Sequence, residues 1–391
     1  MLELIRAGAW LSARRRRAWC LIAGASFAVA LLFLVLTSAD GVDFMGRPLG
    51  SDFLNVWAAG QLVLQGAPAD AYDYATHGQV EWMRFPSLAT YYGWHYPPPF
   101  LLVAALLALL PYVAALAVWL SASFLALGWS ARGLKFSRLA AWAFPGLFIN
   151  ITHGHNGFLS AALMLGGMRL LDNRPWLAGL LLGCLSFKPQ LGVLIPVALL
   201  AAGLWRAFAG AAIAVLGMAL VVWLTLGTAP WLAFIDSLAL TRHAVLEAGA
   251  IGFGKMQNSF AAARLLGAGI ETAWLIQGLT ALVGAFAVFV LWRRPRSNLA
   301  DRALALMLGT VLAAPYLLDY DLMLLAVPLL LKAHEGRFRP WETSYFALLW
   351  ALPLLARPVG MWLYMPLTPL VAGLGLWLLL SNRLPPRQNP V

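Results

Sequence analysis

Apolar runs long enough to span a membrane recur along the whole chain and leave little room for any other fold. The first of them, 18–37, is apolar almost throughout. A helix needs about 20 such residues to cross the hydrocarbon core of a bilayer. With 62% hydrophobic and only 11% charged residues among 391, the chain has too much apolar surface for a soluble domain. We therefore predict an all-α polytopic membrane protein that forms one integral membrane domain, 1–391.

The apolar runs predict about twelve transmembrane helices, including short hairpins. Their ranges are 18–37, 99–127, 139–152, 157–171, 175–187, 189–204, 208–226, 271–292, 301–315, 320–332, 341–356 and 361–380. The pairs 139–152/157–171 and 175–187/189–204 are too short to cross about 30 Å of hydrocarbon alone. Irregular backbone at that depth is tolerated only where it lines a protein or water-filled cavity. We therefore expect their tips, 153–157 and 188–190, at the floor of an outward-facing cavity.

The formal charge of +11 comes from basic residues in the short segments between apolar runs. This is the positive-inside pattern of membrane proteins and does not indicate a nucleic-acid surface. Counting one span at a time places every basic cluster on one side: Arg14–Arg17, Arg132, Lys135, Arg138, Arg169, Arg174, Arg206, Arg293, Arg294, Arg296, Lys332, Arg337, Arg339, Arg383 and Arg387. We predict a multi-pass bacterial inner-membrane protein with both termini in the cytoplasm.

The N-terminal run and the outer loops complete this topology. The run 18–37 is too long for the apolar part of a typical signal peptide, which favours an uncleaved first helix. Two large periplasmic loops, 38–97 and 227–270, are expected to carry short helices. Cys20 and Cys184 both lie in apolar runs and are expected to be buried thiols without a disulfide.

Two charged residues are the main candidates for chemistry. Asp52 precedes an amphipathic stretch, 53–65, in the first outer loop. It is either the N-cap of a helix or a general base for the hydroxyl group of a membrane-bound acceptor. Lys188 interrupts the apolar stretch 176–204, where an ammonium group costs roughly 3 kcal/mol or more unless it is paired or hydrated. It either extends to the interface or contacts an anion such as a lipid phosphate.

Polar residues also gather at the first hairpin tip and at a later span start. His153 and His155 have the spacing of a metal pair, but no third ligand is obvious near them. The flanking glycines favour hydrogen bonding of His153, His155 and Asn156 to sugar or phosphate. Asp319, Tyr320 and Asp321 begin a span, either as helix caps or as sugar ligands. Asp319 is expected to be the exposed cap and Asp321 the inward residue.

Two outer segments carry further candidates, and each leaves two interpretations open. The loop 241–264 and the later Arg357 place basic side chains on the outer side. They bind either an anionic ligand or lipid headgroups. The segment 91–99, with His95 and Tyr96, either anchors the interface or forms a stacking surface for a sugar or polyprenyl chain. The polar residues of the loop are Arg242, His243, Glu247, Lys255, Gln257, Asn258 and Arg264.

An ordered set of short motifs resembles a known family. In chain order they are Ser51-Asp52-Phe53, Ala71-Tyr72-Asp73, Tyr96-Pro97-Pro98, Gly154-His155-Asn156, Lys188-Pro189-Gln190 and Asp319-Tyr320-Asp321-Leu322. The set resembles the polyprenyl-phosphate-sugar-dependent glycosyltransferases of the GT-C superfamily. It is most similar to glycosyltransferase family 87, which includes mannosyltransferases of glycolipid synthesis. The family usually has Gln where this chain has His155, and often His where it has Asp319.

The resemblance implies a GT-C fold and a hexosyl- or pentosyltransferase. Because the sequence shows no convincing set of metal ligands, no metal or other cofactor is expected. The transferase would move a sugar from a polyprenyl-phosphate donor to a lipid or glycan acceptor on the periplasmic face, with inversion. Membrane lipids would be its surroundings, and nucleic acid would not be a partner. Asp52 would be the catalytic base, and Lys188, Lys255 and Arg264 would bind the donor phosphate. The sugar or acceptor would be held by His153, His155, Asn156, Gln190, Gln257, Asn258, Asp319, Tyr320, Asp321, His95 and Tyr96.

A secondary transporter or lipid flippase is the alternative. It would use Lys188 and Asp321 as a coupled pair inside the membrane. Transporters usually show internal repeats and polar residues reachable from both sides. The chain shows no internal repeat, and the cytoplasmic halves of its spans are expected to be nearly free of charge. The transferase is therefore favoured, while a purely structural scaffold would leave Lys188 unexplained.

Overall fold

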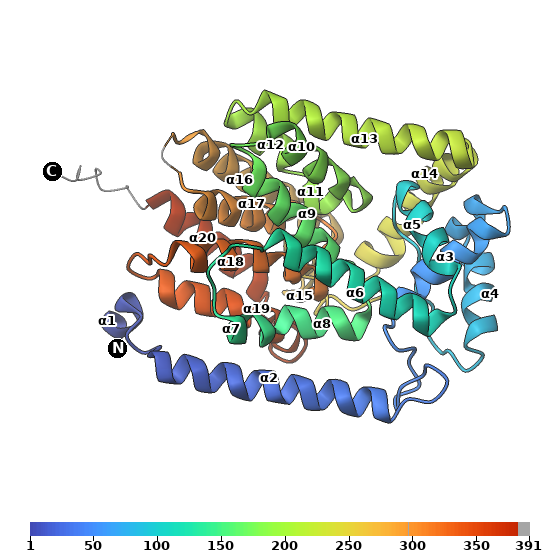
Figure 1. Cartoon of the computed structure of the whole chain (residues 1–391), viewed down its shortest axis with the longest axis horizontal. Coiled ribbons are helices and arrows are strands. Elements are labelled where there is room, and N and C mark those ends of the chain that lie inside the picture. The colour runs from blue at the N-terminus through green and yellow to red at the C-terminus, as the bar shows by residue number, and fades with distance from the viewer. Residues whose placement is uncertain (296, 382–391) are drawn as a thin grey trace.

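The computed structural model describes residues 1–295 and 297–381, and in these the chain is built of helices and connecting loops. The predicted cytoplasmic positions of Arg296, Arg383 and Arg387 lie outside the described residues. In Figure 1, α2 (Ala13–Leu36) and α13 (Trp205–Leu226) lie along opposite sides of a helical bundle. The N-terminus and its short helix α1 (Leu2–Ala7) lie at one end of this bundle.

Among the described residues, five helices are long and apolar enough to cross a membrane. They are α2, α6 (Tyr112–Ser130), α13, α16 (Ile270–Arg293) and α19 (Glu342–Leu363). The all-α prediction is confirmed. Most of the other predicted spans are shorter helices: α8 (Pro145–His153), α9 (Gly157–Leu170), α10 (Pro175–Cys184), α12 (Ile195–Ala201), α17 (Leu299–Ala313), α18 (Ala326–Glu335) and α20 (Leu367–Ser381).

Prolines and one tight turn divide four of the predicted spans. The run 99–127 becomes α5 (Pro99–Ala108) and α6, with Pro111 between them, and 139–152 becomes α7 (Arg138–Trp142) and α8, which begins at Pro145. Proline lacks the N–H that would continue a helix and disfavours helical backbone in the residue before it. The run 189–204 becomes α11 (Pro189–Gly192) and α12, and the run 320–332 begins as the 3₁₀ turn η4 (Asp319–Leu325).

Small residues set the closest helix contacts inside the bundle. A Cβ atom on Gly179 in α10 would lie 2.0 Å from the carbonyl oxygen of Ala207 in α13, so only glycine allows this approach. Such packing is typical of helices in membranes, where apolar side chains gain little by leaving lipid. By contrast, most of α2 is exposed. It is held at α7 and α8, where the rings of Phe27 and Phe148 stack at 4.7 Å.

The two large loops fold against each other. The first loop contains α3 (Phe53–Leu64), the 3₁₀ turn η1 (Pro68–Tyr72) and α4 (Tyr74–Arg84). The second contains α14 (Ala229–Thr241), the π-helical turn η3 (Arg242–Glu247) and α15 (Ser259–Leu265). Tyr72 of η1 contacts Phe234 of α14, with ring centroids 5.8 Å apart. Figure 1 shows α3, α4 and α5 gathered at the end of the molecule opposite the N-terminus.

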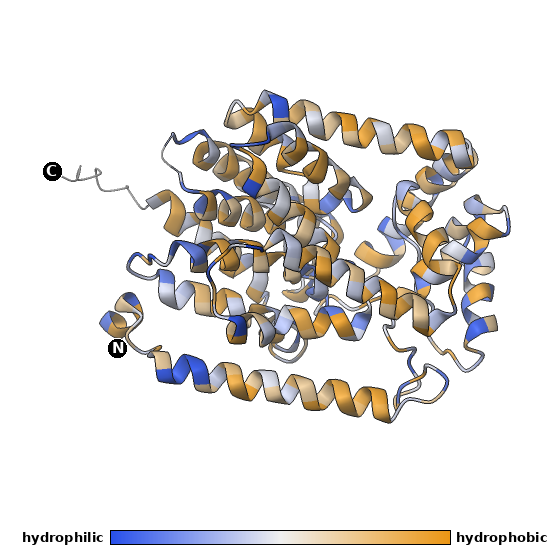
Figure 2. Cartoon of the chain, viewed as in Figure 1, coloured by the Kyte–Doolittle hydropathy of each residue, from blue (hydrophilic) through white to orange (hydrophobic). Residues whose placement is uncertain are grey.

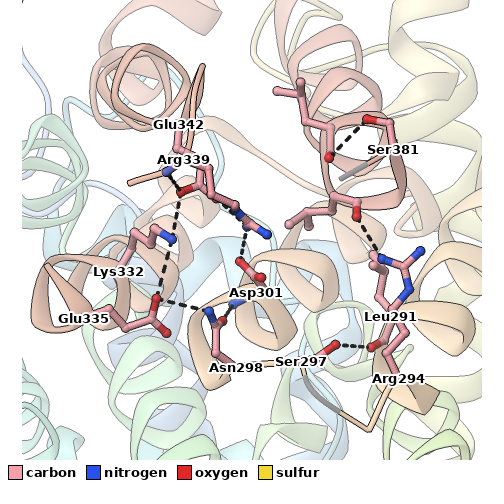
Figure 3. A network of polar contacts seen from close by, with 12 residues as sticks. Leu291, Arg294, Ser297, Asn298, Asp301, Lys332, Glu335, Arg339, Glu342 and Ser381 are labelled. Carbon is pink, nitrogen blue, oxygen red and sulfur yellow. Dashed lines mark hydrogen bonds and ion pairs between the residues drawn. The ribbon is translucent and has the colours of Figure 1, made fainter. Parts of the chain in front are cut away.

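A charged network occupies the end near the N-terminus. Figure 2 shows the hydrophilic start of α2 at this end, and Figure 3 shows the network in detail. Lys332 Nζ lies 2.8 Å from Glu342 Oε2, and Arg339 lies 2.7 Å from Asp301 Oδ1. Lys332 is buried in this network. The sequence predicted spans whose cytoplasmic halves are nearly free of charge, whereas this end of the bundle carries buried charged side chains. Charged residues at the ends of α17, α18 and α19 neutralise one another's charges. The start of α17 is far from the other two helix ends in the chain, so no local sequence pattern reveals their contact.

Candidate active site

Asp52 lies at the start of α3, directly against the first hairpin tip. Its main-chain N–H donates to the carbonyl oxygen of His153 at 3.0 Å. Gly154 has φ +61, and a Cβ there would lie 2.7 Å from Cβ of Phe53, so glycine permits the contact. The Asp52 side chain does not cap α3, and its buried Oδ2 has no hydrogen-bond partner among the described residues. Asp52 thus occupies the N-cap position of α3 without a capping hydrogen bond, and its carboxylate is available to another group.

A hydrogen-bond chain orders the residues of this tip. The amide of Asn156 donates to the hydroxyl of Tyr96 at 2.8 Å, and that hydroxyl lies 3.2 Å from His155 Nε2. Because the Tyr96 oxygen accepts from Asn156, its own proton is free to point at His155. Neutral His155 then carries its proton on Nδ1. That nitrogen and Asn156 Oδ1 are both buried without partners among the described residues, so the tip presents one donor and one acceptor.

Lys188 lies at the second hairpin tip and is only 3% exposed. It precedes Pro189 and adopts φ −136 and ψ 73, which ends the short turn η2 (Leu185–Phe187) before α11 begins. Its ammonium group forms an ion pair with Asp321 and lies 3.4 Å from His155 Nε2. Asp321 Oδ2 in turn accepts from the main-chain N–H of Leu318 at 3.0 Å. The ion pair stabilises two charges that would be costly to bury separately.

Tyr320 joins the two tips to the second large loop. Its ring stacks on His155 with centroids 3.6 Å apart and contacts the edge of the His153 ring at 5.7 Å. The ammonium groups of Lys188 and Lys255 lie 5.1 Å and 5.3 Å from its centroid. Within the described part of the chain, Lys255 forms no ion pair. The cluster therefore presents two cations around one aromatic ring, with one of them neutralised by Asp321.

Several predicted site residues instead hold the loops together. Gln257 donates to the Gly254 carbonyl at 3.2 Å and accepts from Thr368 at 2.6 Å. Asn258 caps α15 through Ala261 N–H and donates to the Pro315 carbonyl at 2.6 Å. The polar atoms of these two amides are thus occupied by the protein. They fix the loop that carries Lys255.

Other predicted residues lie at the margin of the cluster or away from it. Asp319 is buried at 2% exposure and pairs with Arg357 at 3.3 Å, so the prediction of an exposed cap is wrong. Arg264 has local contacts, donating to the carbonyl of Ala268 at 2.7 Å. His95 Nδ1 lies 3.0 Å from the hydroxyl of Thr241, which links the two large loops.

Gln190 is half-buried in the first turn of α11, two residues after Lys188. It is therefore adjacent in sequence to a residue of the cluster, Lys188.

The sequence reading missed a buried polar pair beside Asp52. His77 and Glu81 on α4 are both 0% exposed, with His77 Nδ1 3.8 Å from Glu81 Oε1. His77 Nε2 lies 3.1 Å from the carbonyl oxygen of Asn55, in the first turn of α3. Burial raises the pKa of Glu81 to about 8 and lowers the pKa of His77 to about 4. The sequence signal that could have indicated this helix is Asp73, which caps α4, followed by His77 and Glu81 at a spacing of four residues.

In the described residues, no three His, Cys, Asp or Glu side chains are grouped so that they could hold a metal ion. The cluster combines the carboxylate of Asp52, whose Oδ2 has no partner among the described residues, with two ammonium groups and an aromatic ring. Such a set can accept a proton on one side and stabilise an anion on the other.

The fold and this cluster define a multi-pass membrane protein with a polar site built from its hairpin tips and large loops. The sequence model described as glycosyltransferase family 87 matches residues 94–315, more than half of the chain, and the chain belongs to that family. It is therefore a membrane glycosyltransferase. The matched segment contains Tyr96, His155 and Lys188, whereas Asp52 and Asp321 lie outside it. No curated protein and no solved structure matches the chain.

Proposed function

We propose that this glycosyltransferase moves a sugar from a polyprenyl-phosphate donor to a hydroxyl group of a lipid or glycan acceptor. The observation that carries the proposal is the contact between Asp52 and the tip that leads to His155 and Lys188. It supports a site that combines a buried cation with the carboxylate of Asp52, whose Oδ2 has no partner among the described residues. A transferase of this kind needs a base for the acceptor and a cation for the leaving phosphate.

Asp52 is the proposed general base. It takes the proton of the acceptor hydroxyl as the oxygen attacks the anomeric carbon. The new glycosidic bond forms as the bond between that carbon and the phosphate oxygen breaks, so the configuration inverts. The electron pair of the broken bond stays on the phosphate. Since this leaving oxygen needs no proton, one carboxylate is enough, in contrast to the two of a glycosidase.

Lys188 and Lys255 are the proposed contacts of the leaving phosphate. Charge develops on that phosphate as the bond breaks, and fixed cations in a site shielded from water stabilise it. Asp321 holds Lys188 in position, and the two lysines together still exceed it by one positive charge. The buried side of the site is completed by His155 Nδ1 and Asn156 Oδ1. One donor beside one acceptor suits a sugar hydroxyl, which offers both.

The active site is proposed to face the periplasm of a bacterial inner membrane. The N-terminal end of α2 carries Arg14–Arg17, and the connection between α18 and α19 carries Arg337 and Arg339. Figure 1 places both segments at the end opposite α3 and α4. By the positive-inside rule this end is cytoplasmic, which leaves the two large loops outside.

The Lys188–Asp321 pair is also what a transporter with a coupled intramembrane pair would need. The family match supports the transferase, because it covers the tips that hold the sugar and phosphate candidates.

The test is an assay of the purified protein in lipid nanodiscs. A panel of polyprenyl-phosphate sugars is supplied with total bacterial membrane lipid, and the products are examined by mass spectrometry. We expect an added hexose or pentose on one lipid class, with release of polyprenyl phosphate. Sugar transfer from a nucleotide-sugar alone, with none from the panel, would contradict the proposed donor.

A further inference from the structure

The buried pair of His77 and Glu81 connects three segments of the first large loop. His77 Nε2 donates to the main-chain oxygen of Asn55, three residues after Asp52, at 3.1 Å. Glu81 Oε2 accepts from the main-chain N–H of Tyr92 at 3.0 Å. The pair therefore ties α4 to the first turn of α3 and to the segment before α5. No part of the proposed sugar transfer uses it.

Hydrogen-bond directions fix how many protons the pair needs. Because a carbonyl only accepts, His77 Nε2 must carry a proton. In the neutral ring Nδ1 is then a lone pair, and it faces Glu81 Oε1 at 3.8 Å. Both atoms are buried without a hydrogen-bond partner among the described residues. Two acceptors that face each other repel unless a proton lies between them. The pair therefore needs one proton besides that on Nε2, and both side chains are neutral when this proton is on Glu81.

The surroundings favour this neutral state. Burial is the main cause that raises the pKa of Glu81 to about 8, and the charge of Asp52 is a smaller cause of the same rise. No cation forms an ion pair with Glu81 in the part of the chain that the structure describes. Arg84, on the same helix, lies over the rings of Phe85 and Tyr112 instead. The titratable groups whose charges couple to Glu81 are His77 on α4, Asp52 at the start of α3, Tyr91 and Tyr92 in the segment before α5, and Tyr112 on α6.

We propose that Glu81 and His77 are positioning residues, which share one proton, fix the first turn of α3 and so hold Asp52 in place. Loss of that proton would leave two buried acceptors facing each other, and their repulsion would loosen the contact between α4 and the first turn of α3. This inference rests on the proposed role of Asp52. It adds a condition to that role, since transfer requires Glu81 to be protonated.

The first test needs no substrate. Infrared spectra of the wild type and Glu81→Gln in nanodiscs are compared at pH 6 and pH 9. We expect the difference spectrum at pH 6 to contain the carbonyl band of a protonated carboxylic acid, and this band to be lost at pH 9. An ionised Glu81 at pH 6 would overturn the proposal. Titration of the wild type alone gives the same answer if the variant does not fold.

The second test uses sugar transfer with polyprenyl-phosphate mannose and membrane lipid. Glu81→Gln keeps a neutral group whose oxygen accepts from Tyr92 and whose amide donates to His77. We expect its rate to stay within about threefold of the wild type at pH 7. Between pH 7 and pH 9 the wild type should lose about tenfold and the variant should not. Glu81→Ala should lose activity at every pH, so rescue by glutamine separates the proton from the shape.

Two results would overturn the positioning role. One is a folded Glu81→Gln variant that is inactive at every pH, because the negative charge itself would then be needed. The other is an alkaline loss that is unchanged in the variant. If Asp52→Asn is fully active, the proposed base fails, whereas the infrared result on Glu81 still stands or falls separately.

Discussion

The ammonium group of Lys188 and the carboxylate of Asp321 form a buried ion pair, although 133 residues separate them in the chain. The contact joins the second hairpin tip to the start of η4, and so brings two halves of the candidate site together. Asp321 itself is fixed by the main-chain N–H of Leu318. The cation is therefore held in one place before any donor binds, which is the arrangement that electrostatic stabilisation of a leaving group requires.

Replacement of Lys188 by alanine is expected to impair use of the donor more than binding of the acceptor. The variant loses one of the two cations proposed to contact the leaving phosphate and strands Asp321, at a cost of about 3–5 kcal/mol in stability. The kcat/KM for the donor and the KM for the acceptor are measured separately, with thermal unfolding as a check on folding. Lys135→Ala, at an exposed position, is the control. Donor kinetics that match the wild type would exclude the phosphate role.

Replacement of Asp52 by asparagine is expected to slow transfer by a factor of about 10²–10⁴, the usual contribution of a general base. The fold should be unaffected, because Oδ2 of Asp52 has no hydrogen-bond partner among the described residues. The rate of product formation is compared with that of Asp70→Asn, an exposed aspartate in the same loop. A normal rate in Asp52→Asn would remove the base assignment.

Much of the fold was predictable because it follows from local patterns. The first helix, the two tips and the first large loop, 38–97, all follow from apolar run length, proline and charge. The breaks near Pro111 and Pro145 could not be predicted, because the apolar runs continue through them. Only tertiary packing decides whether a proline ends a helix. The shared site was only a hypothesis, since its contacts join residues that are far apart in the chain.

The missed residues have a common physical reason. His77 and Glu81 look like ordinary polar residues of an exposed helix, and only packing against α3 makes them buried. Gln257 and Asn258 are the opposite case. They resemble ligand-binding amides, yet the main chain around them uses their polar atoms. The sequence gives the chemistry of a side chain, but not which group it contacts in the folded chain.

Removal of the Tyr96 hydroxyl should disorder the first tip. Tyr96→Phe leaves the Asn156 amide and His155 Nε2 without the group that bridges them, at a cost of about 1–3 kcal/mol for the buried polar atoms. We expect a higher KM for the donor, because the orientation of His155 is no longer fixed. The comparison is with Tyr74→Phe, whose ring is exposed. Equal donor KM values in the two variants would contradict this role.

Stability should fall as pH rises from about 6.5 to 8. Glu81 has its pKa raised from 4.5 to about 8, so the folded chain keeps a proton there that the unfolded chain loses above pH 4.5. His77 has its pKa lowered from 6.5 to about 4, so stability increases with pH up to 6.5. The two slopes cancel between pH 4.5 and 6.5.

Above pH 6.5 the protonation of His77 no longer changes the stability, and of this pair only Glu81 still does. The effect of Glu81 amounts to about 2 kcal/mol by pH 8. Thermal unfolding at pH 6.5 and pH 8 measures it. Glu81→Gln should show no such fall, and an equal fall in the variant would exclude Glu81 as its source.

The charged network at the other end of the molecule should support the fold without taking part in transfer. In Figure 3, Lys332 lies between Glu335 and Glu342, at 3.5 Å and 2.8 Å. Lys332→Met removes the cation between the two carboxylates, although Glu342 keeps Arg339 and Glu335 keeps the Asn298 amide. We expect this substitution to lower the unfolding midpoint, with a cost of about 1–3 kcal/mol. The rate of transfer per folded molecule should stay near that of the wild type, because the network lies at the opposite end from α3 and α4. Arg14→Met, at an exposed position, is the matched control. A normal midpoint together with a reduced rate would show instead that this end communicates with the active site.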